Sequence, residues 1–403
     1  MASKNARLSQ SQLLLPILDA LDAAGGSATT ANLYAATAER LQVGADERAA
    51  TVTVGGHVIN TFERSVRWAQ QRARLMALAT TSGNSTWSLT TKGSAALTQS
   101  TPGKIVTVWT TANGVALWAD CSDAVGMIDP RSVQLVLTSP PYPINLQKAY
   151  GGYTVGSEGA YIEWLLRLAD EWGKVITDDG SVAINLGDAW IKGHPRLSLY
   201  QEKLMVAMNE RGGWHLCQRF QWYNSAAMPA PAAWCCVRRI RVKQAVETVW
   251  WLSRSDDPYA DNRQVLRPYS RQMEDAIKAG GQGSAHRPSG HDLSEGAFGA
   301  HNGGSVPPNL IVAANTSSND SYANGCRAAG LDMHPARFPR ALPDFMIKLL
   351  TRERDLVYDP MAGSGTTAAS AEALGRRWIT SERVREYVEG ARFRFETNAV
   401  MAA

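Results

Sequence analysis

The sequence has few cysteines, no metal-ligand pattern and no long apolar run. Its 403 residues include five cysteines, an odd number with no C-x-x-C pair, which argues against a disulfide framework and a zinc knuckle. The seven histidines are scattered without the spacing of a metal site, so we expect no bound metal. No apolar stretch approaches the ~20 residues that span a bilayer, and the first residues lack the apolar core of a secretory signal. We therefore expect a cytoplasmic protein without a membrane partner.

A large excess of charge is also missing, because the formal net charge is only +4. That value is too small to indicate a polyanionic partner. Basic side chains nevertheless gather in one short stretch, at Arg238, Arg239, Arg241 and Lys243. The stretch predicts part of a nucleic-acid groove, with a solvated basic face as the equal alternative. The chain length and a hydrophobic content of 44% fit a globular protein of two domains.

Residues 1–100 are expected to form a small separate domain. The spacing of apolar residues predicts helices over 13–21, 29–41 and 60–75, followed by a hairpin over 77–89. Helices followed by a hairpin suggest a winged helix, and W-S-L-T-T-K-G at 87–93 resembles the end of the N-terminal domain of Mrr-type restriction and modification proteins. Such a domain either holds duplex DNA through contacts to the DNA backbone or binds another protein. The candidate phosphate contacts are Arg64, Arg67, Arg72 and Arg74, and residues 100–104 are expected to be a linker.

From about residue 105 to 400, short apolar strands alternate with helices, which predicts an α/β sheet. The expected strands are 134–137, 181–186, 215–222, 247–252, 356–358 and 378–380. Between about 258 and 333 this alternation fails, because the segment is rich in Gly, Ser, Asn and Pro. A segment of this length inside a regular domain is more often a functional insertion than a plain linker.

The stretch T-S-P-P-Y-P at 138–143 directly follows the apolar run 133–137. Two successive prolines remove two backbone donors, so the strand must end there. Each proline also restricts the residue before it to extended conformations, which presets the carbonyl directions at Ser139 and Pro140. The stretch is therefore either a simple strand stop or a rigid frame that presents acceptors and the Tyr142 ring to a substrate.

A second candidate site is the strand, glycine turn and helix of V-Y-D-P-M-A-G-S-G-T-T at 357–367. Glycines at 363 and 365 allow φ > 0, and the amides that follow face a ligand at a helix N-terminus, which favours a carboxylate or phosphate. Asp359 at the strand end suits a cationic amine, and Glu382 at the end of the next strand suits ribose hydroxyls. A ligand with an amino-acid end and a ribose end is S-adenosylmethionine, which we predict as the cofactor.

These two sites together resemble the motifs of amino-group DNA methyltransferases. T-S-P-P-Y is similar to their catalytic motif, D-P-M-A-G-S-G-T-T to their cofactor loop, H-P-A-R-F-P at 334–339 to the segment before that loop, and A-D-C at 119–121 to their Gly-Asp-Cys. The catalytic motif precedes the loop by 220 residues (359 − 139), the order of the β class. The resemblance covers about residues 105–395.

The resemblance implies a Rossmann-like, mostly parallel, seven-stranded sheet in a methyltransferase domain over 105–400, with the target-recognition region at about 258–333. The catalytic residues that it implies are Ser139, Pro140, Pro141 and Tyr142. The cofactor residues that it implies are Asp359, Pro360, Ala362, Gly363, Ser364, Gly365 and Thr366 on the loop, Glu382 at the ribose, Asp120 and Cys121 near the adenine, and His334 and Phe338 beside the methionine end.

The chemistry of such enzymes explains the catalytic motif. The exocyclic amino group of a base is a poor nucleophile, because its lone pair is delocalised into the ring. Acceptors that hold both amino hydrogens favour a pyramidal nitrogen whose lone pair points at the methyl group. We predict that the Ser139 hydroxyl and the Pro140 carbonyl are these acceptors, and that Tyr142 stacks on a base that has left the duplex. Cys121 lacks the context of a covalent nucleophile, so ring-carbon methylation is not expected.

Several alternatives stay open. A serine at the first motif position favours cytosine N4 over adenine N6, and both remain candidates. A methyltransferase for a protein glutamine or an RNA base, and a non-catalytic winged-helix regulator, are the rival functions. The expected partner is double-stranded DNA, with a homodimer and a separate restriction endonuclease as further candidate partners.

Overall fold

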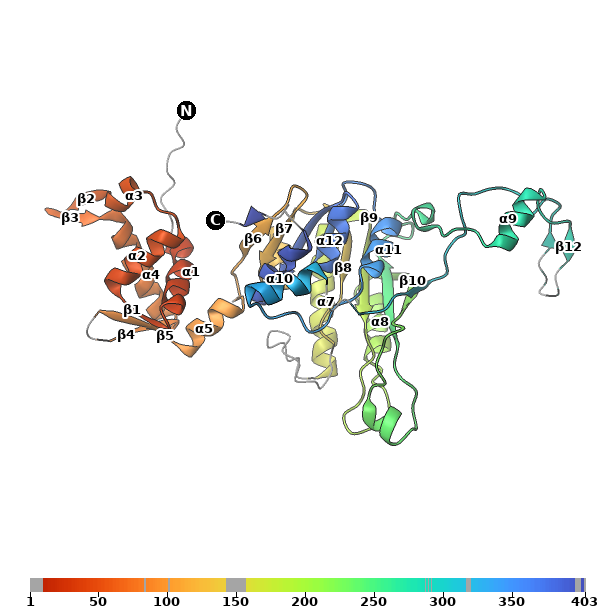
Figure 1. Cartoon of the computed structure of the whole chain (residues 1–403), viewed down its shortest axis with the longest axis horizontal. Helices are drawn as coiled ribbons and strands as arrows, with labels where there is room; N and C mark the ends of the chain where they lie inside the picture. The colour runs from red at the N-terminus through yellow and green to blue at the C-terminus, as the bar shows by residue number, and fades with distance from the viewer. Residues whose placement is uncertain are drawn as a thin grey trace, which may run out of the picture. The chain divides into compact units, whose positions relative to one another are not determined.

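The protein is described by a computed structural model that covers residues 10–82, 85–100, 102–142, 157–286, 288, 290, 292–316, 320–395 and 400–401. It divides the chain into two compact units, Met1–Lys104 and Ile105–Ala402 (Figure 1). Among the described residues, no helix is long and apolar enough to cross a membrane.

The N-terminal unit is built from helices around a small antiparallel sheet of order β1-β5-β4. Its elements are α1 (Gln10–Ala23), β1 (Ser27–Thr29), α2 (Thr30–Arg40), α3 (Ala45–Ala49), β2 (Thr51–Val54), β3 (His57–Asn60), α4 (Thr61–Leu75), β4 (Ala79–Ser82), β5 (Thr86–Leu89) and α5 (Thr91–Thr98). The three predicted helices and the final hairpin are confirmed. The β2–β3 hairpin was not expected, because its apolar side chains Val54 and Val58 are exposed and give no burial pattern.

Helix α4 shows why this part of the chain is helical. Its buried residues Phe62, Val66, Ala69 and Ala73 recur every three or four positions and face α1. Asn60 caps the helix by accepting a hydrogen bond from the Glu63 amide at 2.9 Å. The opposite face carries the arginines that the sequence singled out, and it is exposed.

The second unit contains a ten-stranded sheet of order β14-β10-β11-β9-β8-β15-β16-β7-β6-β17. Its strands are β6 (Val106–Thr110), β7 (Gly114–Trp118), β8 (Val133–Thr138), β9 (Ile176–Leu186), β10 (His215–Tyr223), β11 (Val246–Ser253), β14 (Leu310–Val312), β15 (Leu356–Asp359), β16 (Arg377–Glu382) and β17 (Val400–Met401). The strands β7, β16, β15, β8, β9 and β10 run parallel to one another, and β11 is antiparallel between β9 and β10.

These seven central strands are the mostly parallel sheet that the resemblance implied. The sheet has ten strands because β14 extends one edge and β6 and β17 extend the other. β14 and β17 have only three and two residues, too short to leave a periodic signal. All six residues of β8 are buried, which explains its unbroken apolar sequence, since a strand in the middle of a parallel sheet is covered on both faces.

Helices cover both faces of this sheet (Figure 1). One face packs against α6 (Cys121–Ala124), α7 (Glu158–Val175) and α8 (Tyr200–Glu210) around a core that includes Trp172, Trp214 and Trp250. The other face carries α11 (Ala341–Leu350), α12 (Thr366–Ala373) and α13 (Arg385–Ala391). Helix α10 (Ser321–Ala329) packs against α13.

The region 258–333, expected to be one variable insertion, is divided between two kinds of structure. Its first part holds α9 (Arg271–Lys278) and the short hairpin of β12 (Ala285–His286) and β13 (Asp292–Leu293), and α9 has no buried residue. Its last part belongs to the body of the unit, because β14 pairs with β10 and α10 buries Tyr322 and Cys326. The sequence missed this division since β14 is short and α10 is rich in small residues.

Candidate functional site

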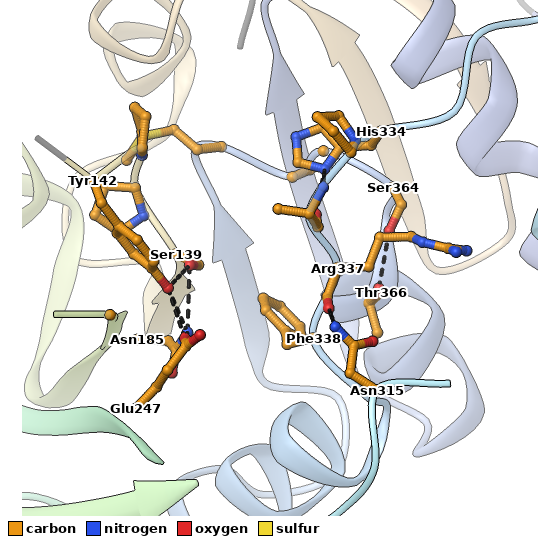
Figure 2. A pocket seen from close by; sticks show the side chains of 18 of the residues that line it. Ser139, Tyr142, Asn185, Glu247, Asn315, His334, Arg337, Phe338, Ser364 and Thr366 are labelled. Carbon is orange, nitrogen blue, oxygen red and sulfur yellow. Dashed lines mark hydrogen bonds between the residues drawn. The ribbon is translucent and has the colours of Figure 1, made fainter. Parts of the chain in front are cut away.

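A cavity of about 430 Å³ lies at the carboxyl edge of the parallel strands. Residues that follow β7, β8, β9 and β15 line it, together with Glu382 at the end of β16 and Glu247 at the start of β11. Since parallel strands end at the same edge, segments far apart in the sequence meet there. Figure 2 shows two groups of polar side chains on opposite sides, one around Ser139 and one around Ser364.

The loop after β15 forms one wall. Glu382 holds this loop, because its carboxylate accepts hydrogen bonds from the Gly363 amide at 2.9 Å and from the Val384 amide at 2.8 Å. Burial raises the pKa of the Glu382 carboxyl, while the backbone hydrogen bonds act in the opposite direction. The carboxylate therefore stands at the cavity wall in a fixed orientation.

The two glycines of the loop have different roles. Gly363 has φ +51°, and a Cβ there would lie 3.1 Å from the His334 ring, so the imidazole packs directly on the loop backbone. Gly365 has φ +72°, and its added Cβ would lie 2.8 Å from the Cβ of Ala391. The absence of a side chain at Gly363 thus lets the His334 ring lie against the loop backbone, whereas its absence at Gly365 lets α12 pack on α13.

His334 closes this wall from the segment before α11. Its backbone amide donates to the Tyr322 hydroxyl at 2.9 Å, and its ring makes an edge contact with Tyr387, with centroids 4.8 Å apart. Burial lowers the pKa of His334 to about 4. The imidazole is therefore neutral at pH 7 and presents an uncharged ring to the cavity.

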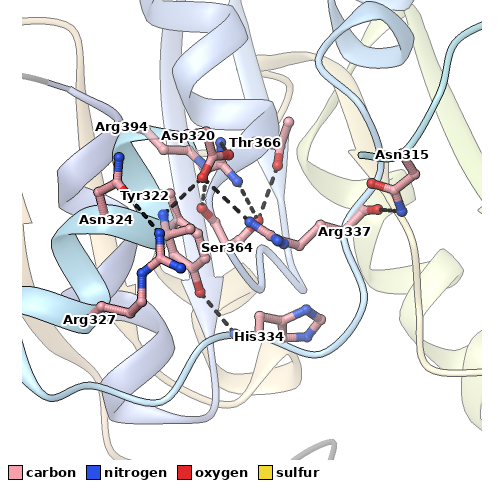
Figure 3. Close-up of polar contacts among 11 residues, drawn as sticks. Asn315, Asp320, Tyr322, Asn324, Arg327, His334, Arg337, Ser364, Thr366 and Arg394 are labelled. Atoms are coloured by element: carbon pink, nitrogen blue, oxygen red, sulfur yellow. Dashed lines mark hydrogen bonds and ion pairs between the residues drawn. The ribbon is translucent and has the colours of Figure 1, made fainter. Parts of the chain in front are cut away.

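A charged cluster behind the loop holds Ser364 in place (Figure 3). Arg394 donates from Nε to the Ser364 carbonyl at 2.7 Å and from Nη2 to the Ser364 hydroxyl at 3.1 Å. Its Nη1 pairs with Asp320 at 3.3 Å, and Arg337 pairs with the other oxygen of Asp320 at 3.6 Å. The Ser364 hydroxyl also contacts Thr366 Oγ1 at 3.1 Å. The cluster connects the start of α10 and the segment directly after α13 to the loop.

The opposite wall is formed by the Ser-Pro-Pro-Tyr stretch and two side chains from the neighbouring strands (Figure 2). The Tyr142 hydroxyl donates to Glu247 Oε2 at 2.8 Å and lies 3.3 Å from Ser139 Oγ. Asn185 Nδ2 donates to Glu247 at 2.8 Å, to Tyr142 at 3.0 Å and to Ser139 at 3.5 Å. Burial raises the pKa of Tyr142, and the charge of Glu247 raises it further.

The Tyr142 ring is also fixed at its edge. A Cβ at Gly187 would lie 2.5 Å from Tyr142 Cε2, so the ring packs against the backbone that follows β9. The residue stands at the cavity wall with its hydroxyl anchored and its ring edge in contact. A ring held at both ends is a rigid surface on which a flat ligand can stack.

Most of the predicted site residues line the same cavity. They are Asp120, Cys121, Ser139, Pro140, Pro141, Tyr142, His334, Phe338, Pro360, Ala362, Gly363, Ser364, Thr366 and Glu382. Asp120 caps α6 by accepting from the Ser122 amide at 3.0 Å, and burial raises the pKa of Cys121 to about 12, so its thiol is protonated. The structure therefore brings together stretches that are more than 200 residues apart.

Two predicted cofactor residues do not line this cavity. Asp359 is only 2% exposed and accepts a hydrogen bond from the Met361 amide at 3.1 Å, so it shapes the loop from beneath. Gly365 faces Ala391. Direct contact of these two residues with a ligand stays a prediction, and in the structure their visible role is to shape the loop and its packing.

The basic stretch lies outside the cavity lining, in the connection from β10 to β11. Arg238, Arg239, Arg241 and Lys243 are all exposed. Arg241 donates to the Pro195 carbonyl at 2.7 Å and Lys243 to the Ala227 carbonyl at 3.2 Å, so these two link neighbouring loops. The connection follows the same sheet edge as the cavity, because β10 is parallel to β9.

Several site residues were missed from the sequence: Asn185, Glu247, Asn315, Asp320, Tyr322, Arg337, Tyr387 and Arg394. Asn185 and Glu247 stand on strands whose apolar neighbours dominate the pattern. A polar residue inside an apolar strand was the available signal, since such a group needs a partner. Arg394 and Asp320 gave no signal, because their pairing joins elements 74 residues apart.

Comparison with known proteins adds to this geometry. A model of the DNA methylase family matches residues 133–393, and a model of the Mrr N-terminal domain matches residues 11–99. The Type II methyltransferase M.PvuII of Proteus hauseri is 39% identical over 294 residues, 72% of this chain and 86% of the relative. The Type II methyltransferase M.BamHI of Bacillus amyloliquefaciens is 25% identical over 271 residues, 65% of this chain and 53% of the relative.

A solved structure adds to the comparison. The PvuII DNA methyltransferase, described as cytosine-N4-specific, superposes with a TM-score of 0.58 at 33% identity. The match covers 73% of this chain and 91% of that one.

Proposed function

Because the chain belongs to the DNA methylase family and is an S-adenosylmethionine-dependent DNA amino-methyltransferase, we propose that its target is the N4 amino group of cytosine. The observation that carries this proposal is the single cavity that joins Ser139 and Tyr142 to the loop 360–366. One wall suits a base that has left the duplex, and the other suits the methyl donor. A serine at the start of the motif and the similarity to a cytosine-N4-specific enzyme favour cytosine over adenine.

The loop wall fits S-adenosylmethionine by its chemistry. The cavity volume of about 430 Å³ is within the range of small-molecule sites. Glu382 presents an oriented carboxylate for the ribose, and the neutral His334 ring adds no positive charge of its own beside the sulfonium. When bound there, the cofactor supplies an electrophilic methyl group. Asp359 is assigned a supporting role, through its hydrogen bond to the Met361 amide.

The Ser139 side of the cavity positions the amino group. We assign the Ser139 hydroxyl and the Pro140 carbonyl as acceptors for its two hydrogens, held in place by the two prolines. Tyr142 serves as the stacking surface, since its hydroxyl and its ring edge are both fixed. This arrangement contributes positioning and electrostatic stabilisation, and no covalent intermediate is required.

The test is methylation of duplex DNA followed by nucleoside analysis with mass spectrometry. N4-methylcytosine is the expected product, and N6-methyladenine alone would overturn the choice of base. Ser139→Ala should lower the single-turnover rate by about 10²-fold or more, by analogy with the loss of one preorganised hydrogen-bonding group. Methylation of RNA or a protein amide instead of DNA would support the rival enzyme function.

We further propose that α4 of the N-terminal unit contacts the phosphates of DNA beside the target. Residues 1–104 contain ten Lys and Arg against six Asp and Glu, whereas residues 105–403 contain 31 of each, so the net charge of +4 belongs to this unit. Arg64, Arg67, Arg72 and Arg74 are exposed on α4. None of the four side chains has an ion pair or hydrogen bond with another described residue, so their guanidinium groups are available for phosphates.

Salt dependence of DNA binding tests this second proposal. Removing two phosphate contacts with the double change Arg64→Ala and Arg67→Ala should reduce the slope of log K against log salt by about 2. The reduction of the slope should appear with long duplexes and should be absent with duplexes that are trimmed close to the target. Arg48→Ala on α3, also exposed, is the matched control. An unchanged slope would indicate a protein-docking role for the unit.

The remaining assignments concern recognition and partners. We propose that the first part of the region 258–333, with α9 and the β12–β13 hairpin, reads the target sequence, helped by the exposed stretch 238–243. A homodimer and a separate restriction endonuclease are the protein partners to test, by sedimentation and by co-purification. Action on DNA also supports a cytoplasmic location. Methylation-aware sequencing of DNA from expressing cells would give the site that is recognised.

A further inference from the structure

We propose that Glu247 is the final acceptor of the proton that the target amino group loses, and that Ser139 and Tyr142 relay this proton to it. The inference rests on the proposed amino methylation. It adds a residue that no motif contains and gives the Tyr142 hydroxyl a role separate from stacking.

The proposal rests on a chain of three side-chain oxygens, those of Ser139, Tyr142 and Glu247, in which each hydroxyl can donate to the next oxygen. Ser139 Oγ lies 3.3 Å from Tyr142 Oη, and Tyr142 Oη donates to Glu247 Oε2 at 2.8 Å. Because the tyrosine proton is used toward Glu247, the serine hydroxyl must donate to the tyrosine oxygen. The serine oxygen then keeps its lone pairs for an amino hydrogen from the cavity.

Asn185 fixes this direction. Its Nδ2 lies 2.8 Å from Glu247, 3.0 Å from Tyr142 and 3.5 Å from Ser139. The two amide hydrogens serve the two nearer oxygens, those of Glu247 and Tyr142, so the tyrosine proton is left to point at Glu247. Asn185 is 2% exposed, so water does not compete for its amide hydrogens.

The proton balance follows from the reaction. As the new N4–CH₃ bond forms, the S–CH₃ bond breaks and its electron pair remains on sulfur, so the positive charge moves from sulfur to the methylated base. The base becomes neutral when one N4–H bond gives its proton to Ser139 Oγ. The serine proton moves to Tyr142 Oη, and the tyrosine proton moves to the Glu247 carboxylate, which ends as a neutral acid.

Glu247 is suited to be the end of this chain. It stands at the start of β11, paired with Trp222 of β10, and it is half-buried, so it can return its proton to solvent after each turnover. Among the described residues, Tyr142 and Tyr200 of α8 are titratable groups that interact with it, and Asp188 lies in the same wall. Both tyrosines are neutral, because burial raises the pKa of each.

The test is the single-turnover methylation rate of Glu247→Gln and Tyr142→Phe as a function of pH. Glu247→Gln should lower the rate by about 10²-fold, the usual contribution of a proton acceptor. The wild-type rate should rise with pH as the acceptor ionises, and this acidic limb should be absent in Glu247→Gln. Tyr142→Phe should reduce the rate similarly, and the double variant should be no slower than either single one.

Binding measurements separate a relay from a structural role. Both variants should bind S-adenosylmethionine with wild-type affinity by calorimetry, and should give the wild-type fluorescence increase with 2-aminopurine at the target position, which reports the extruded base. Glu210→Gln, an exposed carboxyl-to-amide change on α8, is the matched control and should leave rate and pH profile unchanged.

Two outcomes would overturn the relay. One is a Glu247→Gln enzyme with the wild-type rate and the same acidic limb. The other is a variant pair that loses cofactor binding or base extrusion, which would make Glu247 a structural residue. A wild-type enzyme that methylates no DNA would instead remove the proposed function, and that arm is independent of the variants.

Discussion

Removal of the Arg394 side chain is the perturbation for which the structure gives the clearest magnitude. Arg394 is 14% exposed and donates three hydrogen bonds, two to Ser364 and one to Asp320. A hydrogen bond with a charged partner contributes about 1.5–3 kcal/mol, and breaking a buried pair costs about 3–5 kcal/mol. Asp320 keeps Arg337 as a partner at 3.6 Å, so the lower end of that range applies.

Arg394→Ala should therefore lower the free energy of unfolding by about 3 kcal/mol, and the melting temperature by roughly 6–12 °C. The same change frees Ser364, so the affinity for S-adenosylmethionine should fall by at least about tenfold, or 1.4 kcal/mol. Thermal denaturation with and without cofactor measures both effects.

Arg271→Ala is the matched control, because Arg271 is an exposed arginine of α9 and its loss should cost less than about 0.5 kcal/mol. If Arg394→Ala matches this control in stability and binds the cofactor normally, the cluster does not hold the loop and the reasoning fails.

Two further predictions concern the loop and its strand. Gly365→Ala should lower the free energy of unfolding by about 2–4 kcal/mol, because of the positive φ and the overlap with Ala391. The control Gly330→Ala, at φ +67° in open space, should lower it by only about 1–2 kcal/mol. Chemical denaturation measures both, and equal losses would contradict the packing argument. Burial raises the pKa of Asp359 to about 6. The folded protein therefore binds this proton more tightly than the unfolded chain, whose Asp pKa is about 4. The resulting contribution to the free energy of unfolding, about 3 kcal/mol, is present below pH 4 and should be lost as the pH rises through 6. Asp359→Asn should remove that loss when unfolding is compared at pH 4 and pH 7, and an unchanged difference would argue against the buried carboxyl.

Much of the fold was predictable because local patterns carry it. The continuous apolar run of β8 predicts a strand buried on both faces, and the three-to-four spacing in α4 predicts a helix with one inward face. The edge strands β14 and β17 and the β2–β3 hairpin were not predicted, because short or exposed segments bury too little apolar surface to impose a pattern on the sequence.

The sequence by itself determined the chemistry at each motif. Two prolines restrict the Ser139 backbone, and two glycines permit a tight loop before α12, whatever the rest of the chain does. These are local properties of φ and of the missing or present Cβ. Together with the family resemblance, they were sufficient to predict the cofactor loop and the catalytic stretch.

Only the tertiary structure decided which side chains support these motifs. Glu247 reaches Tyr142 because β11 lies antiparallel beside β9, and Arg394 reaches Ser364 because the segment after α13 returns beside the loop. It also placed Asp359 beneath the cavity, since strands on both sides bury the end of β15. Contacts of this kind depend on strand order and helix packing, which no local spacing records.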